Sequence, residues 1–329
     1  MKTLIIAEAG VNHNGNFETA LKMINAAKEA GADIVKFQTS ITSTSKFSEK
    51  AEYQKKATGA NESQLDMIKK LRFSFEQHEK LKEYCDSIGI HYLSTPFDFE
   101  SIDFLNGIGV EFWKVPSGEI VNIPYLIKIA KTHKDILMST GIATMKEIKD
   151  AIYLLEENGA GTIRLMQCTT QYPASYENIN LNAIKTLRVE FGKEVGLSDH
   201  SMGIEVPIAA VALGAGIIEK HFTLDRNMPG PDQKASIEPD ELKSMIESIR
   251  HIESALGDGK KIPCQGEIEN IYAARKSIVA RRDIKAGEIF TDENIVPRHA
   301  GNGISPSRWK EAIGSKAKRN FMEDEMIEL

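Results

Sequence analysis

The chain has 329 residues, enough for two average domains or for one α/β barrel with a small additional module. Hydrophobic residues make up 41% and charged residues 27%, as in ordinary globular proteins, and the net charge of −6 argues against nucleic acid as a partner. Three widely spaced cysteines indicate a reducing compartment, and no apolar segment is long enough for a signal peptide or a membrane span, so we expect a cytoplasmic protein that does not bind membranes.

Short apolar runs alternate with helical patterns along the first 256 residues. The runs predicted to be strands are 4–9, 33–38, 91–95, 112–116, 136–140, 162–168, 194–200 and 217–221. The patterns predicted to be helices are 20–30, 64–71, 75–88, 98–105, 124–131, 144–157, 182–191, the alanine-rich segment between the last two strands, and 238–256. Residues 39–63 are polar and have no clear period, which predicts a lid or binding loop.

This alternation predicts a (β/α)₈ TIM barrel for residues 1–256. Eight strand–helix units over about 255 residues match the usual length of that fold. The competing fold, an open doubly wound sheet, would need a G-x-G-x-x-G loop after the first strand. The sequence there is A-E-A-G-V-N-H-N-G, which does not supply that loop.

The C-terminal part of the chain has a different pattern. Residues 257–272 lose the helical period and are predicted to be a linker. Residues 273–329 contain short segments with glycine turns, which predict a mostly β module. A core made by about 55 residues is marginally stable, so we expect the module to dock on a barrel, its own or that of a partner.

Two histidines end neighbouring strands of the predicted barrel. His200 follows the seventh strand and His221 ends the eighth, and parallel strands joined by a helical crossover finish at the same edge of the sheet. We therefore expect the two imidazoles side by side, surrounded by Ser198, Asp199, Glu219 and Lys220. Such a pair suits a divalent metal or a general base. The alternative is that each histidine only caps a strand with a hydrogen bond.

Other polar side chains also lie at strand ends, where TIM barrels carry their chemistry. Lys36 and Lys114 are notable because a buried ammonium group is costly without an anionic partner. They and four hydroxyl residues form a predicted binding site for phosphate or carboxylate, which we call the anion cradle: Lys36, Thr95, Lys114, Ser117, Ser139 and Ser198. The alternative is that the lysines form internal ion pairs, with Glu8 and Glu119 as partners.

Two further candidates lie outside the strands. Asp232 follows a rigid P-G-P turn, although most such aspartates only order the turn. Arg281, Arg282 and Arg298 of the small module form either a solvated basic face or a group that reaches an acidic substrate in a barrel mouth.

Motifs along essentially the whole chain resemble the bacterial sialic acid synthases, which include the N-acetylneuraminate and N,N'-diacetyllegionaminate synthases. In order, these motifs are A-E-A-G-V-N-H-N-G, V-K-F-Q-T, S-T-P-F-D, W-K-V-P-S-G-E, M-S-T-G, Q-C-T-T-Q-Y-P, L-S-D-H-S-M-G, E-K-H-F-T-L-D and P-G-P-D. The segment R-K-S-I-V-A-R-R-D-I-K-A-G-E-I-F-T-D-E-N-I is similar to the family's antifreeze-protein-like (SAF) domain.

The resemblance implies a reaction in which phosphoenolpyruvate condenses with an open-chain N-acylhexosamine to a nine-carbon keto acid and phosphate. It implies N-acetylmannosamine as the acceptor and N-acetylneuraminate as the product, with 2,4-diacetamido-2,4,6-trideoxymannose and N,N'-diacetyllegionaminate as the alternative. It also implies a Mn²⁺ or Mg²⁺ ion at His200 and His221, and a domain-swapped homodimer whose small domain covers the partner's barrel mouth. The anion cradle matches the family's phosphoenolpyruvate site. Positions around the acceptor and the reacting centre are matched by Glu8, Gln38, Glu119, Tyr172 and Asp232.

The small domain departs from the family's pattern. Family members often carry K-R-P-G-N-G-I-S-P there, with the arginine near the N-acyl group of the sugar. This chain has P-R-H-A-G-N-G-I-S-P, so His299 stands in the arginine's place and Arg298 precedes it. Either Arg298 takes over the role or acceptor recognition differs.

Two other functions remain open on the sequence. A metal-dependent sugar aldolase or isomerase on the same barrel would convert sugar without phosphoenolpyruvate. A saccharide-binding or ice-binding protein would use the small module and have no turnover. The second has little use for a histidine pair and two cradled lysines.

Overall fold

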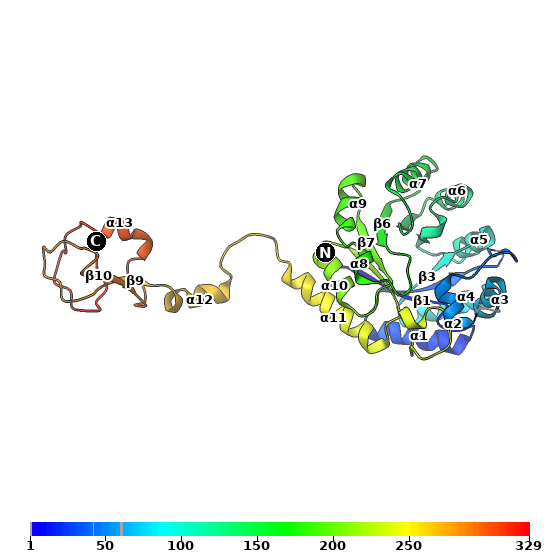
Figure 1. The fold of residues 1–329 in the computed structure, drawn as a ribbon, viewed down its shortest axis with the longest axis horizontal. Helices are drawn as coiled ribbons and strands as arrows, with labels where there is room; N and C mark the ends of the chain where they lie inside the picture. The colour runs from blue at the N-terminus through cyan, green and yellow to red at the C-terminus, as the bar shows by residue number, and fades with distance from the viewer. Residues whose placement is uncertain (1, 42, 60–61) are drawn as a thin grey trace. The chain divides into compact units, whose positions relative to one another are not determined.

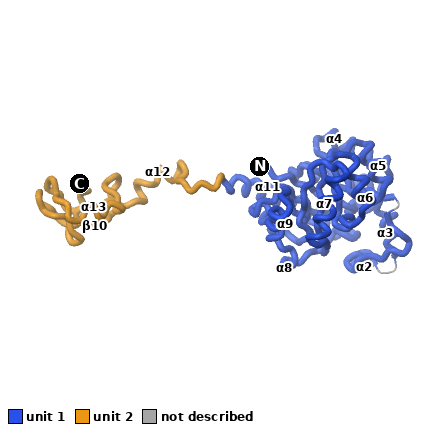
Figure 2. The backbone as a smooth tube through the Cα atoms, turned by 90° about the horizontal axis from the view of Figure 1, so that it is seen from above, with its two compact units in different colours: residues 1–257 blue, residues 258–329 orange. Residues whose placement is uncertain are grey.

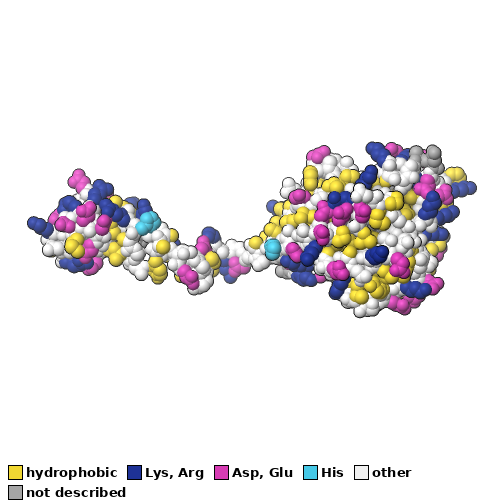
Figure 3. Space-filling view, turned by 90° about the horizontal axis from the view of Figure 1, so that it is seen from below, with side chains coloured by type: hydrophobic (Ala, Val, Ile, Leu, Met, Phe, Trp, Pro, Cys, Tyr) yellow, Lys and Arg dark blue, Asp and Glu magenta, His cyan; other side chains and the backbone are white. Residues whose placement is uncertain are grey.

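The computed structural model describes residues 2–41, 43–59 and 62–329, which form two compact units, residues 1–257 and 258–329 (Figure 2). The predicted boundaries at residues 256 and 272 stay a prediction. On the face shown in Figure 3, basic and acidic side chains are interspersed over both units. Within the described ranges, no helix combines the length and the apolar character that crossing a bilayer requires.

The first unit is a TIM barrel, as predicted (Figure 1). Its eight parallel strands are β1 (Leu4–Gly10), β2 (Ile34–Thr39), β3 (His91–Pro96), β4 (Phe112–Val115), β5 (Asp135–Ser139), β6 (Ile163–Cys168), β7 (Val195–Asp199) and β8 (Ile217–His221). They are hydrogen-bonded in the order β3-β2-β1-β8-β7-β6-β5-β4. The two strands at the ends of this order, β3 and β4, lie in contact and nearly close the barrel.

The helices of this unit surround the strands (Figure 1). They are α1 (Phe17–Ala30), α2 (Glu52–Thr58), α3 (Gln64–Leu71), α4 (Phe75–Ile88), α5 (Phe99–Gly107), α6 (Ile123–Ala130), α7 (Met145–Glu157), α8 (Tyr176–Ile179), α9 (Ala183–Phe191), α10 (Glu205–Ala212) and α11 (Pro239–Ala255). Helix α7 illustrates how the sequence sets the boundaries, because Thr144 and Glu147 form the predicted capping box at its start.

Alternate side chains of each strand point into the barrel, so the barrel interior is packed in layers. Six apolar side chains from different strands pack together as a floor: Ile6, Ile34, Leu93, Leu137, Met166 and Ile217. Alternate side chains point to the same face of a strand, so the residue two positions later lies above this floor. Those residues are Glu8, Lys36, Thr95, Ser139, Cys168 and Glu219, and all of them line one cavity. The floor separates this polar layer from the opposite end of the barrel.

The predicted loop 39–63 contains a short helix that the sequence pattern did not reveal. Helix α2 has no buried residue and therefore no apolar stripe, which is the feature that makes helices recognisable in a sequence. The amide of Ala51 donates to Gln54 Oε1 at 3.0 Å and so caps its first turn. Residues 42, 60 and 61 of this predicted loop lie outside the described residues.

The second unit contains a small β module preceded by a helix. Strands β9 (Ser277–Ala280) and β10 (Ile295–Arg298) pair antiparallel, and isolated bridges such as Ile284 to Phe321 extend the β structure. Two short helices, η3 (Pro306–Arg308) and α13 (Trp309–Ala312), complete it. Its core is built from Ile278, Ala280, Ile284, Phe290, Ile295, Ala312, Ala317, Phe321 and Ile327. Helix α12 (Gln265–Ala274) occupies much of the predicted linker and buries none of its residues.

Candidate active site

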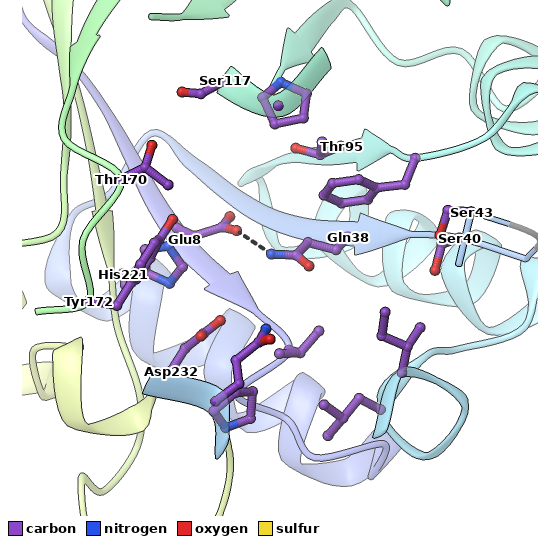
Figure 4. A pocket seen from close by; sticks show the side chains of 18 of the residues that line it. Glu8, Gln38, Ser40, Ser43, Thr95, Ser117, Thr170, Tyr172, His221 and Asp232 are labelled. Atoms are coloured by element: carbon purple, nitrogen blue, oxygen red, sulfur yellow. Dashed lines mark hydrogen bonds between the residues drawn. The ribbon is translucent and has the colours of Figure 1, made fainter. Parts of the chain in front are cut away.

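A cavity of about 520 Å³ lies at the carboxyl ends of the barrel strands (Figure 4). Every site residue predicted from the first unit lines it: Glu8, Lys36, Gln38, Thr95, Lys114, Ser117, Glu119, Ser139, Tyr172, Ser198, His200, His221 and Asp232. In Figure 4, Glu8 and Gln38 lie between Thr95 and Ser117 on one side and Asp232 on the other. Arg298 belongs to the second unit, where its guanidinium group pairs with the Asp324 carboxylate.

The register of the parallel strands explains why Glu8 and Lys36 meet. Glu8 on β1 is paired with Lys36 on β2 and with His221 on β8. The Lys36 ammonium lies 2.8 Å from Glu8 Oε2 and 3.2 Å from the Thr95 hydroxyl, and both charged side chains are buried. Gln38 Nε2 donates to the other oxygen of Glu8 at 3.4 Å. The Glu8 carboxylate and the Thr95 hydroxyl are thus the hydrogen-bond partners of Lys36 in the cavity wall.

Glu219 links the two lysines of the anion cradle. Its Oε1 atom lies 3.4 Å from the ammonium of Lys114 and accepts a 2.8 Å hydrogen bond from the Ser198 hydroxyl. Its Oε2 atom lies 3.6 Å from the ammonium of Lys36. Lys114 in turn donates to the Ser139 hydroxyl at 2.7 Å. Side chains from five strands thus lie within contact distance of one another, because the barrel arranges β2, β4, β5, β7 and β8 around one axis.

Two carboxyl groups of the cavity, Glu8 and Glu219, have pKa values on opposite sides of the ordinary range. Burial raises the pKa of Glu8 to about 7, although the charge of Lys36 opposes that shift. Burial also disfavours the charged form of Glu219, but Lys114 and Lys36 outweigh it and lower its pKa to about 2. A carboxyl that titrates near neutrality beside one that stays ionised is the arrangement by which enzymes separate proton transfer from electrostatic stabilisation.

The predicted histidine pair is present. The ring centres of His200 and His221 lie 5.3 Å apart, and Tyr172 contacts both rings, at 4.1 Å and 5.7 Å. His200 Nδ1 lies 2.8 Å from the Thr169 carbonyl oxygen. Burial lowers the pKa of His221 well below its usual value, so its ring stays neutral at physiological pH.

The histidine pair fits a divalent cation by the chemistry of its donors. His221 Nδ1 is buried and has no hydrogen-bond partner among the residues that the structure describes, so this nitrogen is available as a ligand when the ring is neutral. Imidazole nitrogens are common ligands of divalent transition metals. Among the residues that the structure describes, no group of three or more His, Cys, Asp or Glu side chains is arranged to hold an ion. The protein would therefore supply two ligands here, and substrate or water the others.

Two features of the cavity wall were not predicted from the sequence. Tyr53 of α2 stacks on Tyr172 with ring centres 4.8 Å apart, so the two aromatic rings form part of the cavity wall. Cys168 at the end of β6 also lines the cavity, with its sulfur 4.0 Å from His200 Nδ1. Asp232 is buried in the same wall, and burial raises its pKa to about 6. Only Cys168 could have been predicted from the sequence. It lies two positions after the inward-facing Met166 on the same strand, and residues two apart point to the same face.

Three details differ from the sequence-based expectations. Asp199 and Lys220 do not line the cavity but pair with each other at 2.6 Å, because each is one position out of phase with the inward-facing residues of its strand. Among the ion pairs of the described residues, none joins Glu119 to a lysine. The Oε2 atom of Glu119 instead accepts a 2.5 Å hydrogen bond from Asn122, which begins helix α6. The ion pairs proposed as an alternative to the anion cradle thus exist, but with Glu8 and Glu219 as the carboxylates.

Comparison with known proteins identifies relatives over the whole chain. The NeuB family model matches residues 23–261, and the SAF domain model matches residues 275–328. An N,N'-diacetyllegionaminic acid synthase of Campylobacter jejuni is 50% identical over 99% of this chain and 99% of its own length. One of Legionella pneumophila is 44% identical over 98% of this chain and 92% of its own length. The crystal structure of an N-acetylneuraminic acid synthetase of Leptospira borgpetersenii, in complex with citrate, superimposes with a TM-score of 0.73 at 36% identity, covering 82% of this chain and 90% of that one.

Proposed function

The chain belongs to the NeuB family and is a nonulosonic acid synthase, and from this premise we propose that it makes N,N'-diacetyllegionaminate. The substrates are phosphoenolpyruvate and the open-chain form of 2,4-diacetamido-2,4,6-trideoxymannose, and the second product is phosphate. The observation that carries this choice of acceptor is the 50% identity, over nearly the full length of both chains, to a synthase of that product. N-acetylmannosamine remains the second candidate, because the Leptospira structure of an N-acetylneuraminic acid synthetase has the same fold at 36% identity.

The anion cradle supports the binding of phosphoenolpyruvate. Two buried ammonium groups, Lys36 and Lys114, lie among the hydroxyls of Thr95, Ser139 and Ser198. Such groups can neutralise a phosphate and a carboxylate together, and charge-assisted hydrogen bonds to them are the stronger kind. The hydroxyl of Ser117 lines the same wall and accepts from the Gly141 amide at 2.9 Å.

Glu8 is the group that we assign to proton transfer. As C3 of phosphoenolpyruvate attacks the aldehyde carbon, the aldehyde oxygen gains a proton, and a carboxyl with a pKa of about 7 can donate it at neutral pH. The cation left at C2 takes up water. This water gives one proton back to the Glu8 carboxylate and leaves a hydroxyl group on C2. The phosphate then leaves with the electron pair of its C2–O bond and takes up the proton of that hydroxyl, so that C2 becomes the keto carbon. Glu219 stays ionised and stabilises the cationic C2 centre from the cavity wall.

His200 and His221 are the residues that we propose to hold a divalent ion, Mn²⁺ or Mg²⁺. When bound, such an ion supplies a Lewis acid to the aldehyde of the acceptor. The acceptor itself would lie against Tyr172, Tyr53, Gln38 and Asp232, which line the same cavity as the histidines. Aromatic rings suit a sugar with a methyl group and two acetamido groups, which is less polar than N-acetylmannosamine.

We further propose that the protein acts as a domain-swapped homodimer in the cytoplasm. In the first unit, Val121 and Ile142, on the segments after β4 and β5, are 61% and 77% exposed, and Ile123 at the start of α6 is 58% exposed, which suits a surface that another chain covers. Arg298 of the partner subunit's small unit would then face the acceptor. Sedimentation or light scattering that gives the mass of a single chain at micromolar concentration would contradict this part of the proposal.

A single assay tests the proposed reaction. The purified full chain is stripped of metal, supplied again with Mn²⁺ or Mg²⁺, and given phosphoenolpyruvate with either acceptor. We expect phosphate release only with the ion present, with 2,4-diacetamido-2,4,6-trideoxymannose as the better acceptor, and a product with the mass of N,N'-diacetyllegionaminate. Preference for N-acetylmannosamine would select the second candidate, and turnover of either sugar without phosphoenolpyruvate would point to an aldolase or isomerase.

A further inference from the structure

Glu219 occupies the space between the two cationic groups that bind the anion. Its carboxylate lies 3.4 Å from the ammonium of Lys114 and 3.6 Å from that of Lys36, and it accepts from the hydroxyl of Ser198. These three partners all belong to the anion cradle. A carboxylate of the protein thus already uses the groups on which a phosphate would depend.

The contacts of Glu219 are electrostatic more than directional. Its Oε2 atom is buried and has no hydrogen-bond partner within the described ranges of the chain, and its 3.6 Å distance to the Lys36 ammonium is beyond the range of a hydrogen bond. A buried acceptor left unpaired in this way is uncommon. The side chain is therefore held in place mainly by the two positive charges and by the single hydroxyl contact.

The presence of this carboxylate lowers the net charge that the site offers to a phosphate. The negative charge of Glu219 offsets part of the positive charge of Lys36 and Lys114, and Glu8, 2.8 Å from Lys36, offsets more of it whenever its carboxyl is ionised. A site with two unbalanced lysines would bind inorganic phosphate more tightly, because Coulomb attraction in a buried site is weakly screened. Tight binding of a product slows its release, and release limits the turnover of many enzymes.

We propose that Glu219 is an internal competitor for the phosphate group, which weakens the binding of product phosphate and so allows it to leave the anion cradle. This inference rests on the proposed function in taking phosphate to be a product of the site. It adds a task for Glu219 that is separate from stabilising the reacting centre, because weaker phosphate binding can be measured without any reaction.

Exchange of Glu219 for glutamine tests the proposal. Glu219→Gln keeps the size of the side chain and the contact with Ser198 but removes the negative charge. We expect the full chain, supplied with Mg²⁺, to bind inorganic phosphate at least about tenfold more tightly by calorimetry. In turnover, inhibition by added phosphate should strengthen by the same factor.

Two variants serve as controls. Glu119→Gln removes one charge from the same cavity, but in the described part of the chain Glu119 is hydrogen-bonded to Asn122 and is not an ion-pair partner of either lysine. We expect it to change phosphate affinity less than threefold. Glu219→Asp keeps the charge and should bind phosphate within a few-fold of the native protein, which also covers the case in which Glu219→Gln does not fold.

The inference fails if Glu219→Gln binds phosphate no more tightly than the native chain, or if both Glu→Gln variants tighten binding equally. It also fails if Glu219→Asp, which keeps the charge, binds phosphate as tightly as we expect of the glutamine variant. The proposed function fails in a different way, namely when the native chain releases no phosphate with either acceptor. Phosphate binding by the native chain and its variants is measured without acceptor, so the two failures are distinguishable.

Discussion

Replacing Lys114 by glutamine should strongly reduce the efficiency with which phosphoenolpyruvate is used. The Lys114 ammonium is buried, lies 3.4 Å from Glu219 Oε1 and donates to the Ser139 hydroxyl at 2.7 Å. Glutamine can still donate to that hydroxyl but carries no charge. Removing one partner of a buried, charge-assisted contact costs about 2 to 5 kcal/mol. At about 1.4 kcal/mol for each factor of ten, kcat/KM for phosphoenolpyruvate should fall by about 30-fold to several thousand-fold.

The assay follows phosphate release while phosphoenolpyruvate is varied at saturating acceptor. Ser139→Ala is the matched control, because it removes the hydroxyl that holds Lys114 and leaves the charge in place. Loss of that one hydrogen bond is worth about 0.5 to 1.5 kcal/mol, so we expect a decrease of at most about twelvefold. If folded Lys114→Gln loses less than tenfold in kcat/KM, or if only the KM for the acceptor changes, our assignment of the cradle to phosphoenolpyruvate is wrong.

Three further predictions concern other parts of the barrel. Tyr53→Ala should raise the KM for the acceptor by about 2- to 12-fold, since stacked aromatic contacts are worth about 0.5 to 1.5 kcal/mol. Tyr53→Phe should remain near the native value, and an equal rise in the KM for phosphoenolpyruvate would contradict this role. His221→Gln should lose the binding of one Mn²⁺ per chain that we expect electron paramagnetic resonance to detect in the native protein, and unchanged Mn²⁺ binding would remove the metal from this pair. For stability, burial lowers the pKa of His78 from 6.5 to about 4, so below pH 6.5 the unfolded state binds a proton that the folded state excludes. As the pH falls from 6.5 to 4, His78 should therefore lower the free energy of unfolding by about 1.4 kcal/mol per pH unit. Urea unfolding at several pH values gives the slope of the unfolding free energy against pH, and in His78→Gln this slope should be smaller by that amount. A slope equal to that of the native protein would mean that His78 is not the residue that titrates.

The barrel was predictable because its elements repeat two simple periods. Apolar runs of four to seven residues alternate with helical patterns, and each observed strand lies within two residues of its predicted range. Helix α2 was missed because its residues show no apolar stripe. Helix α12 has three apolar residues at helical spacing, Ile268, Ile271 and Tyr272, but this short pattern follows a polar, glycine-containing segment and was included in the predicted linker. Because α2 carries Tyr53, the contact between Tyr53 and Tyr172 was not predicted from the sequence either.

The strands were predicted better than the face of the strand to which each polar side chain points. Asp199 and Lys220 were expected around the histidines, but a shift by one residue turns a side chain to the other face of the sheet. Glu219 precedes Lys220 in β8 but faces the cavity. It lies between two lysines that come more than a hundred residues earlier in the chain. The sequence indicated that Lys36 and Lys114 need anionic partners, but it could not identify which carboxylates these are.

Local periodicity and residue type therefore determined the eight strands, their order along the chain and the edge of the sheet at which polar side chains gather. These properties depend on neighbours within a few residues, and the sequence contains that information directly. Only the tertiary structure decided that Glu219 is shared between Lys36 and Lys114, and that Glu8 and Glu219 have pKa values far apart. Those properties depend on distances between different strands and on exclusion of water, both of which arise only when the barrel closes around its axis.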